Sequence, residues 1–391
     1  MIDVDRLRSD TPGVREVVHF NNAGAALMPT PVIDAMRSYL DDEILRGGYE
    51  TARRRTNQIE GVYGSLASLI GASRHEIALA DNATRAWDML FYSMGLGEGD
   101  RILTTTSEYV SNWAAYLHVR DTRGVDVVVV PDDTHGAIDL ERLEQMVDDV
   151  PTSLITLNHM PTNGGLVNPA AEVGSIARSH GVPFLLDACQ TVGQVPIDVD
   201  EIQCDMLTAT SRKYLRGPRG LGFSYIREEF IEHLSPVFVE LESAPVVLPD
   251  RYTLATSARR FETWEKSYVG VVGLGAAAEY AHEIGVPDIW ERIQFLAARM
   301  RLLLWQIDGV TVYDQGRVQG GIVTFDIESR QPLEIQELLA ENSINVSTST
   351  PFSAPIDMHR RQIEGLVRAS VHAYNTEEEI EDLIEAVAVM A

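Results

Sequence analysis

Residues 204–220 read Cys204-Asp205-Met206-Leu207-Thr208-Ala209-Thr210-Ser211-Arg212-Lys213-Tyr214-Leu215-Arg216-Gly217-Pro218-Arg219-Gly220. The first half is an apolar run typical of a buried strand, and the second half is a basic turn with glycine and proline. The chain has only two lysines, Lys213 and Lys266, against thirty arginines. A lysine amine can lose its proton and attack a carbonyl, which arginine cannot do. Lys213 is therefore predicted to form a Schiff base; a surface lysine in a loop is the alternative.

Composition narrows the class of protein. The 391-residue chain is long enough for one large and one smaller domain, and its formal net charge of −26 argues against nucleic acid and anionic membranes as partners. Two cysteines, Cys189 and Cys204, give no disulfide framework or metal cluster. The N-terminus lacks a signal-peptide core, and no apolar run reaches the roughly 18 residues of a membrane span. A cytoplasmic protein is expected.

Strand patterns alternate with helical patterns in the first part of the chain. The expected strands are 101–105, 125–130, 154–158, 182–187, 206–210 and 221–226. The expected helices are 32–45, 84–94, 140–147 and 170–180. This alternation predicts an α/β fold with a mostly parallel sheet covered on both faces. Ligands of such sheets bind beyond the carboxyl ends of the strands, where Asp187 and Lys213 lie.

The pattern changes after residue 240. We expect a loop over 243–254, long helices over 269–282 and 289–306, and a small α+β unit from 321–327, 333–341 and 366–370. A last helix over 377–389 is predicted to begin after Thr376 as its N-cap. We expect a large domain of residues 18–255 and a small domain of residues 1–17 and 256–391.

An aldehyde cofactor with a phosphate and a pyridine ring needs an amine, an acid for the ring nitrogen and a phosphate cradle. Asp187 is the candidate acid, because a carboxylate that ends an apolar strand is costly to bury unless it meets a cation. Capping of the next helix is the alternative role for Asp187. The helix opening at Ala83 and Thr84 is the candidate phosphate cradle, with Thr210 and Arg212 approaching from the lysine turn.

Further polar and aromatic residues could complete such a site. Tyr109 follows a strand and could stack on a planar ring, although a core tyrosine is an equal alternative. The candidates for a hydrogen bond to the ring hydroxyl are Thr162, Asn163 and Gln190. Arg368 is the best candidate for a substrate carboxylate, since a guanidinium binds a carboxylate through two parallel hydrogen bonds.

Together these segments resemble the class V aminotransferase family of pyridoxal-phosphate (PLP) enzymes, fold type I, from about residue 18 to residue 374. That family includes cysteine desulfurases, isopenicillin-N-epimerase-like proteins and C–S lyases. The segments that carry the resemblance are His159 to Pro169, Asp187-Ala188-Cys189-Gln190, and Arg212-Lys213 with Gly217-Pro218-Arg219-Gly220. The resemblance implies a large domain with a seven-stranded type of sheet, a small α+β C-terminal domain, and a homodimer whose partner subunit contributes near the phosphate.

The resemblance also implies roles. Lys213 would form the internal aldimine and move the Cα proton, Asp187 would pair with the pyridine nitrogen, and Gln190 would contact the ring hydroxyl. The residues implied in phosphate binding are Ala83, Thr84, Thr210 and Arg212. The residues implied in holding an amino-acid substrate are Asn22, Ala23 and Arg368.

Residues 347–355 depart from the desulfurase pattern. In cysteine desulfurases this loop carries a nucleophilic cysteine, and here it has none. Tyr109 replaces the stacking histidine, Arg212 replaces the histidine before the lysine, and Thr162 stands where asparagine is usual. We therefore expect β-elimination by a C–S lyase acting on a cysteine derivative, and not desulfuration through a loop cysteine. Transamination or epimerisation of an amino acid is the alternative.

Two other classes of protein are alternatives to a PLP-dependent enzyme. Gly273, Gly275 and Ala278 match the G-x-G-x-x-A pattern of nicotinamide enzymes, but no apolar strand precedes them and a close-packed helix suits them better. A catalytically silent PLP-binding protein is the other alternative, and the full set of Lys213, Asp187, Gln190 and Arg368 argues against it.

Overall fold

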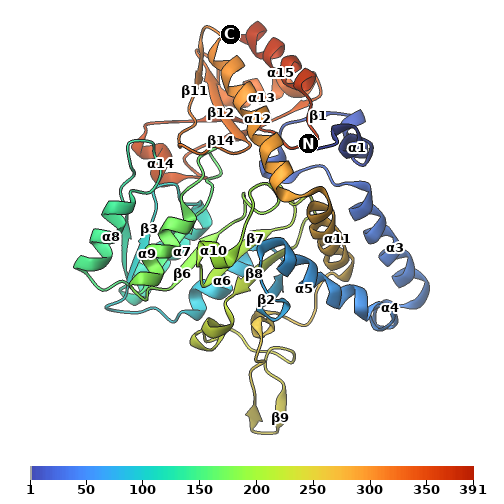
Figure 1. Ribbon diagram of the computed structural model, residues 1–391, viewed down its shortest axis with the longest axis vertical. Coiled ribbons are helices and arrows are strands. Elements are labelled where there is room, and N and C mark those ends of the chain that lie inside the picture. Colours follow the sequence, from blue (N-terminus) through green and yellow to red (C-terminus); the bar gives the residue numbers. More distant parts are fainter. Residues whose placement is uncertain (1) are drawn as a thin grey trace.

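The computed structural model describes residues 2–391, and its centre is a seven-stranded sheet (Figure 1). The strand order is β2-β8-β7-β6-β5-β3-β4. The strands are β2 (Ile77–Ala80), β3 (Arg101–Thr104), β4 (Asp126–Val129), β5 (Leu154–Asn158), β6 (Phe184–Asp187), β7 (Met206–Thr210) and β8 (Gly222–Ile226). β8 runs antiparallel to both its neighbours, and the other paired strands are parallel. The expected α/β fold with a mostly parallel sheet is confirmed.

The register of the central strands brings polar residues together at one edge. Asn158 at the end of β5 pairs with Asp187 at the end of β6, and Asp187 pairs with Thr208 of β7. The residues of these three strands are buried throughout, as their unbroken apolar runs predict. Side chains that follow the strands therefore meet beyond their carboxyl ends.

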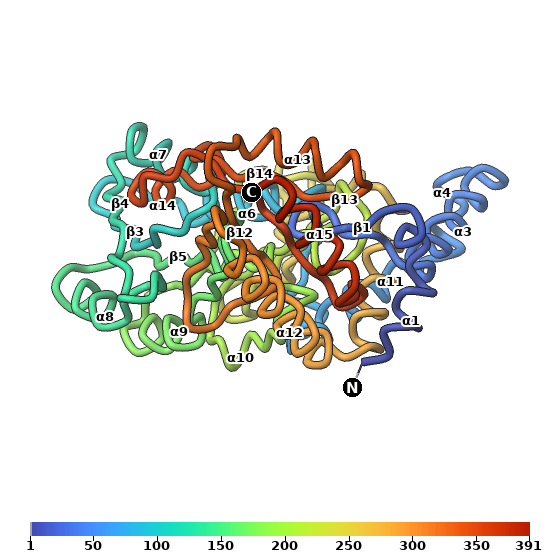
Figure 2. The backbone as a smooth tube through the Cα atoms, turned by 90° about the horizontal axis from the view of Figure 1, so that it is seen from above, coloured from blue at the N-terminus to red at the C-terminus, as the bar shows by residue number. Residues whose placement is uncertain are grey.

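Helices cover both faces of this sheet, because successive strand residues point to opposite sides. Leu186 and Leu207 pack in one core with α5 (Thr56–Ile70), α8 (Leu140–Asp149), α9 (Ala170–Ser179) and α11 (Tyr268–Ile284). Leu185 and Met206 pack in another core with α6 (Ala83–Ser93) and α7 (Val110–Arg123). Seen from above, α8 lies at one end of the molecule and α3 (Thr30–Arg46) and α4 (Gly48–Arg54) at the other (Figure 2).

The Gly273-x-Gly275 segment lies inside α11, which packs against α3 and α5. A Cβ atom on Gly273 would approach Met36 Cγ to 2.7 Å, and one on Gly275 would approach Val62 Cγ2 to 2.7 Å. These glycines serve close helix packing, and the segment does not open a helix after a strand as a dinucleotide-binding turn does.

A second, four-stranded sheet forms the upper part of the molecule in Figure 1, in the order β11-β12-β15-β14. Its strands are β11 (Val310–Val312), β12 (Ile322–Ile327), β14 (Ser347–Ser349) and β15 (Leu366–Ser370). It shares a separate core with α12 (Val286–Trp305), α13 (Pro332–Glu341) and α15 (Glu377–Met390). Thr376 caps α15 in a capping box with Glu379, as expected. The shorter elements of this part are α1 (Val4–Ser9), β1 (Val18–His19), α2 (Asn22–Ala25), β13 (Ile344–Asn345) and α14 (Pro355–Arg360).

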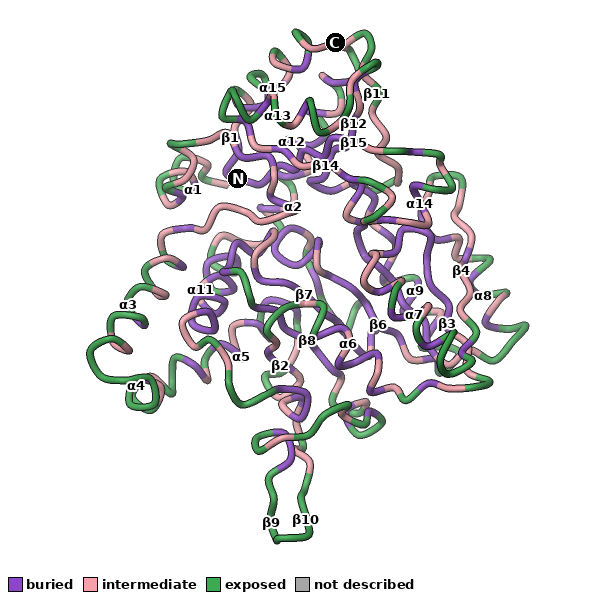
Figure 3. The backbone as a smooth tube through the Cα atoms, turned by 180° about the vertical axis from the view of Figure 1, so that it is seen from behind, coloured by how far each residue is buried: buried purple, intermediate pink, exposed green. Residues whose placement is uncertain are grey.

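Residues 243–254 differ from the expected loop. They contain a short hairpin of β9 (Val246–Leu248) and β10 (Arg251–Tyr252) that projects from the molecule and is exposed along its length (Figures 1 and 3). None of the helices within residues 2–391 is both long and apolar enough to cross a membrane.

Candidate active site

A cavity of about 240 Å³ opens beyond the carboxyl ends of β5, β6 and β7. The predicted site residues that line it are Ala83, Thr84, Tyr109, Thr162, Asp187, Gln190, Thr210, Arg212 and Lys213. They come from segments between residues 83 and 213, and the register of the sheet brings them together. The prediction of one shared site at this edge thus agrees with the geometry for nine side chains.

Lys213 is half-buried in the cavity wall. The pKa of its amine is lowered to about 8, chiefly by burial and also by the positive charges of Arg212 and Arg368, while Cys189 and Asp187 act in the opposite direction. A desolvated amine with a lowered pKa is partly neutral near physiological pH, and the neutral form is the nucleophile.

Asp187 is buried, and both of its oxygens are held by neutral donors. Asn112 Nδ2 donates to Oδ2 at 2.9 Å, and the backbone N–H of Cys189 donates to Oδ1 at 3.0 Å. Neither donor carries a positive charge, so the carboxylate has no hydrogen-bonded cation to offset its burial, although the charge of Lys213 acts on it through space. A protonated pyridine nitrogen in the cavity would supply that charge.

The start of α6 provides the features of a phosphate cradle. Asn82 is the N-cap, and its side chain accepts a hydrogen bond from Arg85 N at 2.9 Å. Gly222 of β8 lies directly under this turn, where an added Cβ would come within 2.7 Å of Ala83 N. Arg212 approaches the same region and donates to Thr210 Oγ1 at 2.9 Å. Free N–H groups, the helix dipole and a guanidinium together suit a phosphate.

Gln190 provides a test of whether the residues fit a PLP ring. Its Nε2 donates to the carbonyl of Ala23 at 3.2 Å, but its buried Oε1 has no hydrogen-bond partner. A buried acceptor without a donor is costly, and the hydroxyl of a bound pyridoxal ring is a donor of the required kind. With Lys213, Asp187 and the α6 turn around the same cavity, the residues present fit this cofactor.

Thr162 and Asn163 have different positions although they are adjacent. Thr162 lines the cavity, whereas Asn163 is turned away and donates to Asp357 Oδ2 of α14 at 2.7 Å. Asn163 therefore anchors the segment that follows residues 347–355, and the geometry gives it no contact with the cavity. Residues 347–355 themselves are held at Ser353, whose carbonyl accepts from Val110 N at 3.2 Å.

Arg368 lies behind Thr162 and is buried. Its NH1 donates to the backbone oxygen and to the hydroxyl of Thr162 at 3.0 and 2.8 Å, and its NH2 donates to Asn21 Oδ1 at 3.3 Å. All of these acceptors are neutral, and Nε has no partner. Burial lowers the pKa of Arg368 to about 10. A buried guanidinium without a carboxylate is suited to bind one from a ligand.

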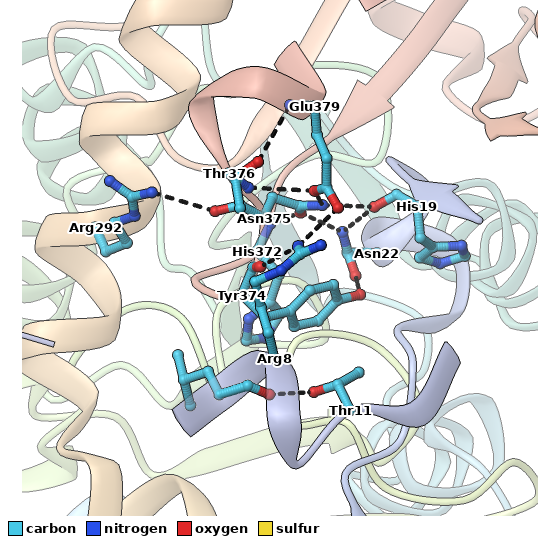
Figure 4. A network of polar contacts seen from close by, with 11 residues as sticks. Arg8, Thr11, His19, Asn22, Arg292, His372, Tyr374, Asn375, Thr376 and Glu379 are labelled. Atoms are coloured by element: carbon cyan, nitrogen blue, oxygen red, sulfur yellow. Dashed lines mark hydrogen bonds and ion pairs between the residues drawn. The ribbon is translucent and has the colours of Figure 1, made fainter. Parts of the chain in front are cut away.

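Asn22 and Ala23, also predicted to hold substrate, are buried and do not line the cavity. Asn22 belongs to the polar network in Figure 4, in which Tyr374 donates to its Oδ1. Its Nδ2 also donates to the Ser370 carbonyl at 2.7 Å. Ala23 reaches the site through its carbonyl, which accepts from Gln190. This geometry gives both residues an indirect part, through the placement of Gln190.

Sequence reasoning missed several residues of the cavity wall. They are Trp87, Asn112, Asn158, Met160, Cys189, Arg219, Gly220 and Leu221. Asn112 is the most important of these because it contacts Asp187. It lies one helical turn after Tyr109, and this spacing places both residues on one face of α7, a signal that was present in the sequence.

Comparison with known proteins supports this reading of the cavity. The family model described as "Aminotransferase class-V" matches residues 18–383. A "Probable cysteine desulfurase" of Methanothermobacter thermautotrophicus is 31% identical over 98% of this chain and 97% of that protein. The solved "Apo structure of Cysteine Desulfurase from Thermococcus onnurineus NA1" has a TM-score of 0.91 and 27% identity, and the match covers 100% of this chain and 98% of that one. A C-DES mutant, with glycine covalently linked to its PLP cofactor, has a TM-score of 0.87 and 23% identity over 97% of this chain and 98% of that one.

These relatives correct the expected reaction. The missing cysteine in 347–355 led us to expect β-elimination by a C–S lyase and not desulfuration through a loop cysteine. That expectation is wrong, because relatives that match almost the whole chain are named cysteine desulfurases. The missing cysteine does not decide the reaction, because a cysteine in this loop would serve only as a sulfur acceptor. Its absence removes one acceptor and leaves the amine, the acid and the guanidinium of the cavity in place.

The matched residues include every segment that lines the cavity, and the fold agrees with solved members over the full chain. The family's cofactor is PLP, and the unpartnered Gln190 Oε1, the uncompensated Asp187 and the Lys213 amine fit its ring and aldehyde. The protein is a member of the class V aminotransferase family of PLP-dependent enzymes.

Proposed function

We propose that this protein is a cysteine desulfurase, which transfers the sulfur of cysteine to a thiol. The observation that carries the proposal is a cavity lined by Lys213 and Asp187, with a buried Arg368 that has no acidic partner directly behind its wall at Thr162. This set suits an amino acid bound through its amine and its carboxylate. The names of the relatives supply the reaction class.

The bound cofactor would supply an electron sink for the bonds at the substrate's α-carbon. The chain's residues would place the reacting atoms. Arg368 would hold the carboxylate, and Asp187 would keep the proton on the ring nitrogen. The Lys213 amine, with a pKa of about 8, would take and return the Cα proton as a general base and acid.

Whether the acceptor thiol comes from this chain depends on the state of its two cysteines. Cys204 is fully buried, and Cys189 lines the cavity, but burial raises the pKa of each thiol well above its ordinary value. Neither is poised as a thiolate. We therefore propose a thiol from another molecule as acceptor. The carbon–sulfur bond of cysteine breaks, a sulfur–sulfur bond forms on the acceptor, and the thiol proton ends on carbon, so that cysteine and thiol give alanine and a persulfide.

A homodimer is part of the proposal. The phosphate end of the cavity is open in one subunit, since Asn82, Thr84 and Arg219 are exposed there. Phe238 is also exposed, and its ring lies 5.3 Å from the guanidinium of Arg85. Arg85 belongs to the first turn of α6, as Thr84 does. An apolar surface beside an open site suits a partner subunit. The cytoplasmic location and the division at residues 18 and 255 stay predictions.

Product analysis tests the proposed reaction. The purified protein is loaded with PLP and given L-cysteine, with and without dithiothreitol as the added thiol. We expect alanine in both the wild type and Cys189→Ser, and in both we expect its yield to depend on dithiothreitol. Pyruvate and ammonia in place of alanine, or a requirement for an added keto acid, would rule out desulfuration. Loss of alanine in Cys189→Ser alone would instead assign the acceptor to Cys189.

A further inference from the structure

A second buried carboxyl group lies directly behind Asp187. Glu108, in the connection between β3 and α7, is 1% exposed. Asn112 Nδ2 donates to Glu108 Oε1 at 2.9 Å and also to Asp187 Oδ2 at 2.9 Å. An amide nitrogen carries two hydrogens, so the Asn112 side chain uses one on each carboxyl group. Glu108, Asn112 and Asp187 thus form a continuous chain that ends at the cavity.

The surroundings of Glu108 contain donors but no cation. Besides Asn112, it accepts from Thr104 Oγ1 at 2.8 Å, from the Tyr116 hydroxyl at 3.1 Å and from the N–H of Tyr109 at 2.9 Å. Four neutral donors can hold a carboxylate in place, yet burial and the nearby charge of Asp187 raise the pKa of Glu108 to about 7. Above that pH the protein keeps two negative charges side by side, which is costly unless a positive charge comes between or beside them.

A purely structural role explains only part of these contacts. The bonds from Thr104 and Tyr109 are local and would shape the β3–α7 connection alone. The bond from Asn112 to Asp187 spans 75 residues in the sequence and joins α7 to the end of β6. It fixes Oδ2 of Asp187, while the N–H of Cys189 fixes Oδ1, so the plane of the carboxylate is set from both sides.

We propose that Glu108 is a positioning residue that acts through Asn112: it holds Asp187 in orientation and adds a second negative charge that keeps the cofactor's ring nitrogen protonated. The inference rests on PLP binding and not on the reaction proposed above. The other titratable groups that face this chain are Tyr116 from α7 and, around Asp187, the side chains of Lys213, Arg212 and Cys189.

The experiment follows the ring nitrogen itself. Holoenzyme is prepared with PLP labelled at that nitrogen, and its protonation is measured by nitrogen NMR as pH rises from about 7 to 10. In Glu108→Gln we expect the ring proton to be lost about one pH unit lower than in the wild type, because one negative charge has been removed. In Asn112→Leu, which replaces the amide by two methyl groups and so breaks the connection, we expect a shift in the same direction. Steady-state kinetics should show kcat reduced about tenfold, with KM little changed.

Asp205→Asn is the matched control. Asp205 is another poorly exposed carboxylate of the same sheet, but it lies at the opposite end of the strands, where it accepts from Phe184 N at 2.9 Å. We expect its ring-nitrogen titration to equal the wild type's. A wild-type titration in both Glu108→Gln and Asn112→Leu, even with a lower melting temperature, would reduce Glu108 to a structural role and overturn the proposal. If Glu108→Gln does not fold, Asn112→Leu alone decides. Because the NMR titration is done without substrate, its outcome does not depend on desulfuration.

Discussion

The side chain of Lys213 has its reactivity set by its surroundings, because burial lowers its pKa from 10.5 to about 8. Covalent attachment of PLP to the cofactor-free protein should therefore become faster as pH rises and level off above about pH 8, where the amine is neutral. Stopped-flow absorbance measures this rate. A rate that still rises steeply between pH 9 and 10, as for an ordinary lysine, would show that the amine is solvated.

Arg368 is expected to decide affinity for the substrate carboxylate. Arg368→Lys keeps the charge but loses the forked geometry, so KM for cysteine should rise about tenfold or more. Arg361→Lys is the control, because Arg361 already pairs with Asp357 at 3.3 Å, away from the cavity wall. Equal KM values for the wild type and Arg368→Lys in steady-state assays would remove Arg368 from substrate binding.

At this scale the sequence predicted about half of the residues that line the cavity. Lys213 could be found because lysine is so rare in the chain. Asp187 could be found because burying a carboxylate at the end of an apolar strand is costly unless a cation is near it. Asn163 could not be separated from Thr162, since which of two adjacent residues faces a cavity depends on the backbone of the turn. Asn22 was predicted to touch substrate, and its burial depends on Tyr374, which lies 352 residues away.

The contact between β8 and the start of α6 yields a prediction for one element. A Cβ on Gly222 would come within 2.7 Å of Ala83 N and 2.9 Å of the Ala209 carbonyl, and backbone atoms cannot easily yield. Gly222→Ala should cost about 1–3 kcal/mol of unfolding free energy and weaken PLP binding, because the phosphate turn is displaced. Thermal melting and PLP titration measure the two effects.

Gly61→Ala in α5 is the control for this change, since nothing lies within 4 Å of the added Cβ. It should leave PLP affinity unchanged and raise stability slightly, because alanine favours a helix. PLP affinity that stays at the wild-type value in Gly222→Ala would separate this turn from phosphate binding.

The predicted strands β3 to β8 and most helices are present, because their apolar runs are long and regular. The sequence did not reveal α5, in which Gly61 and Gly64 lower helix propensity and whose stability comes from packing against α11. It also did not reveal α7, whose first turn presents polar residues to the cavity. The hairpin of β9 and β10 was missed because a proline-rich stretch favours a loop, and its pairing is only a few residues long.

At the scale of the whole molecule, the exposed hairpin is a candidate surface for the proposed dimer. Val246, Val247 and Leu248 are 72%, 52% and 50% exposed, an apolar surface that a monomer would leave in water. We expect light scattering to give about twice 43.3 kDa for the wild type. Val246→Glu with Leu248→Glu should shift the mass toward the monomer and lower PLP retention. Trp305→Glu, at an exposed position on α12, should remain dimeric; a wild-type monomer would refute the dimer.

The central claim is that PLP is bound covalently to Lys213 and not to Lys266. The most direct measurement is borohydride reduction of the PLP-loaded protein, followed by peptide mass spectrometry, for the wild type, Lys213→Ala and Lys266→Ala. Lys266 is the natural control, because its amine is paired with Glu262. We predict a pyridoxyl group on Lys213 in the wild type and in Lys266→Ala, and no label with at least about 10³-fold slower turnover in Lys213→Ala. A label on Lys266, or full turnover in Lys213→Ala, would contradict the account.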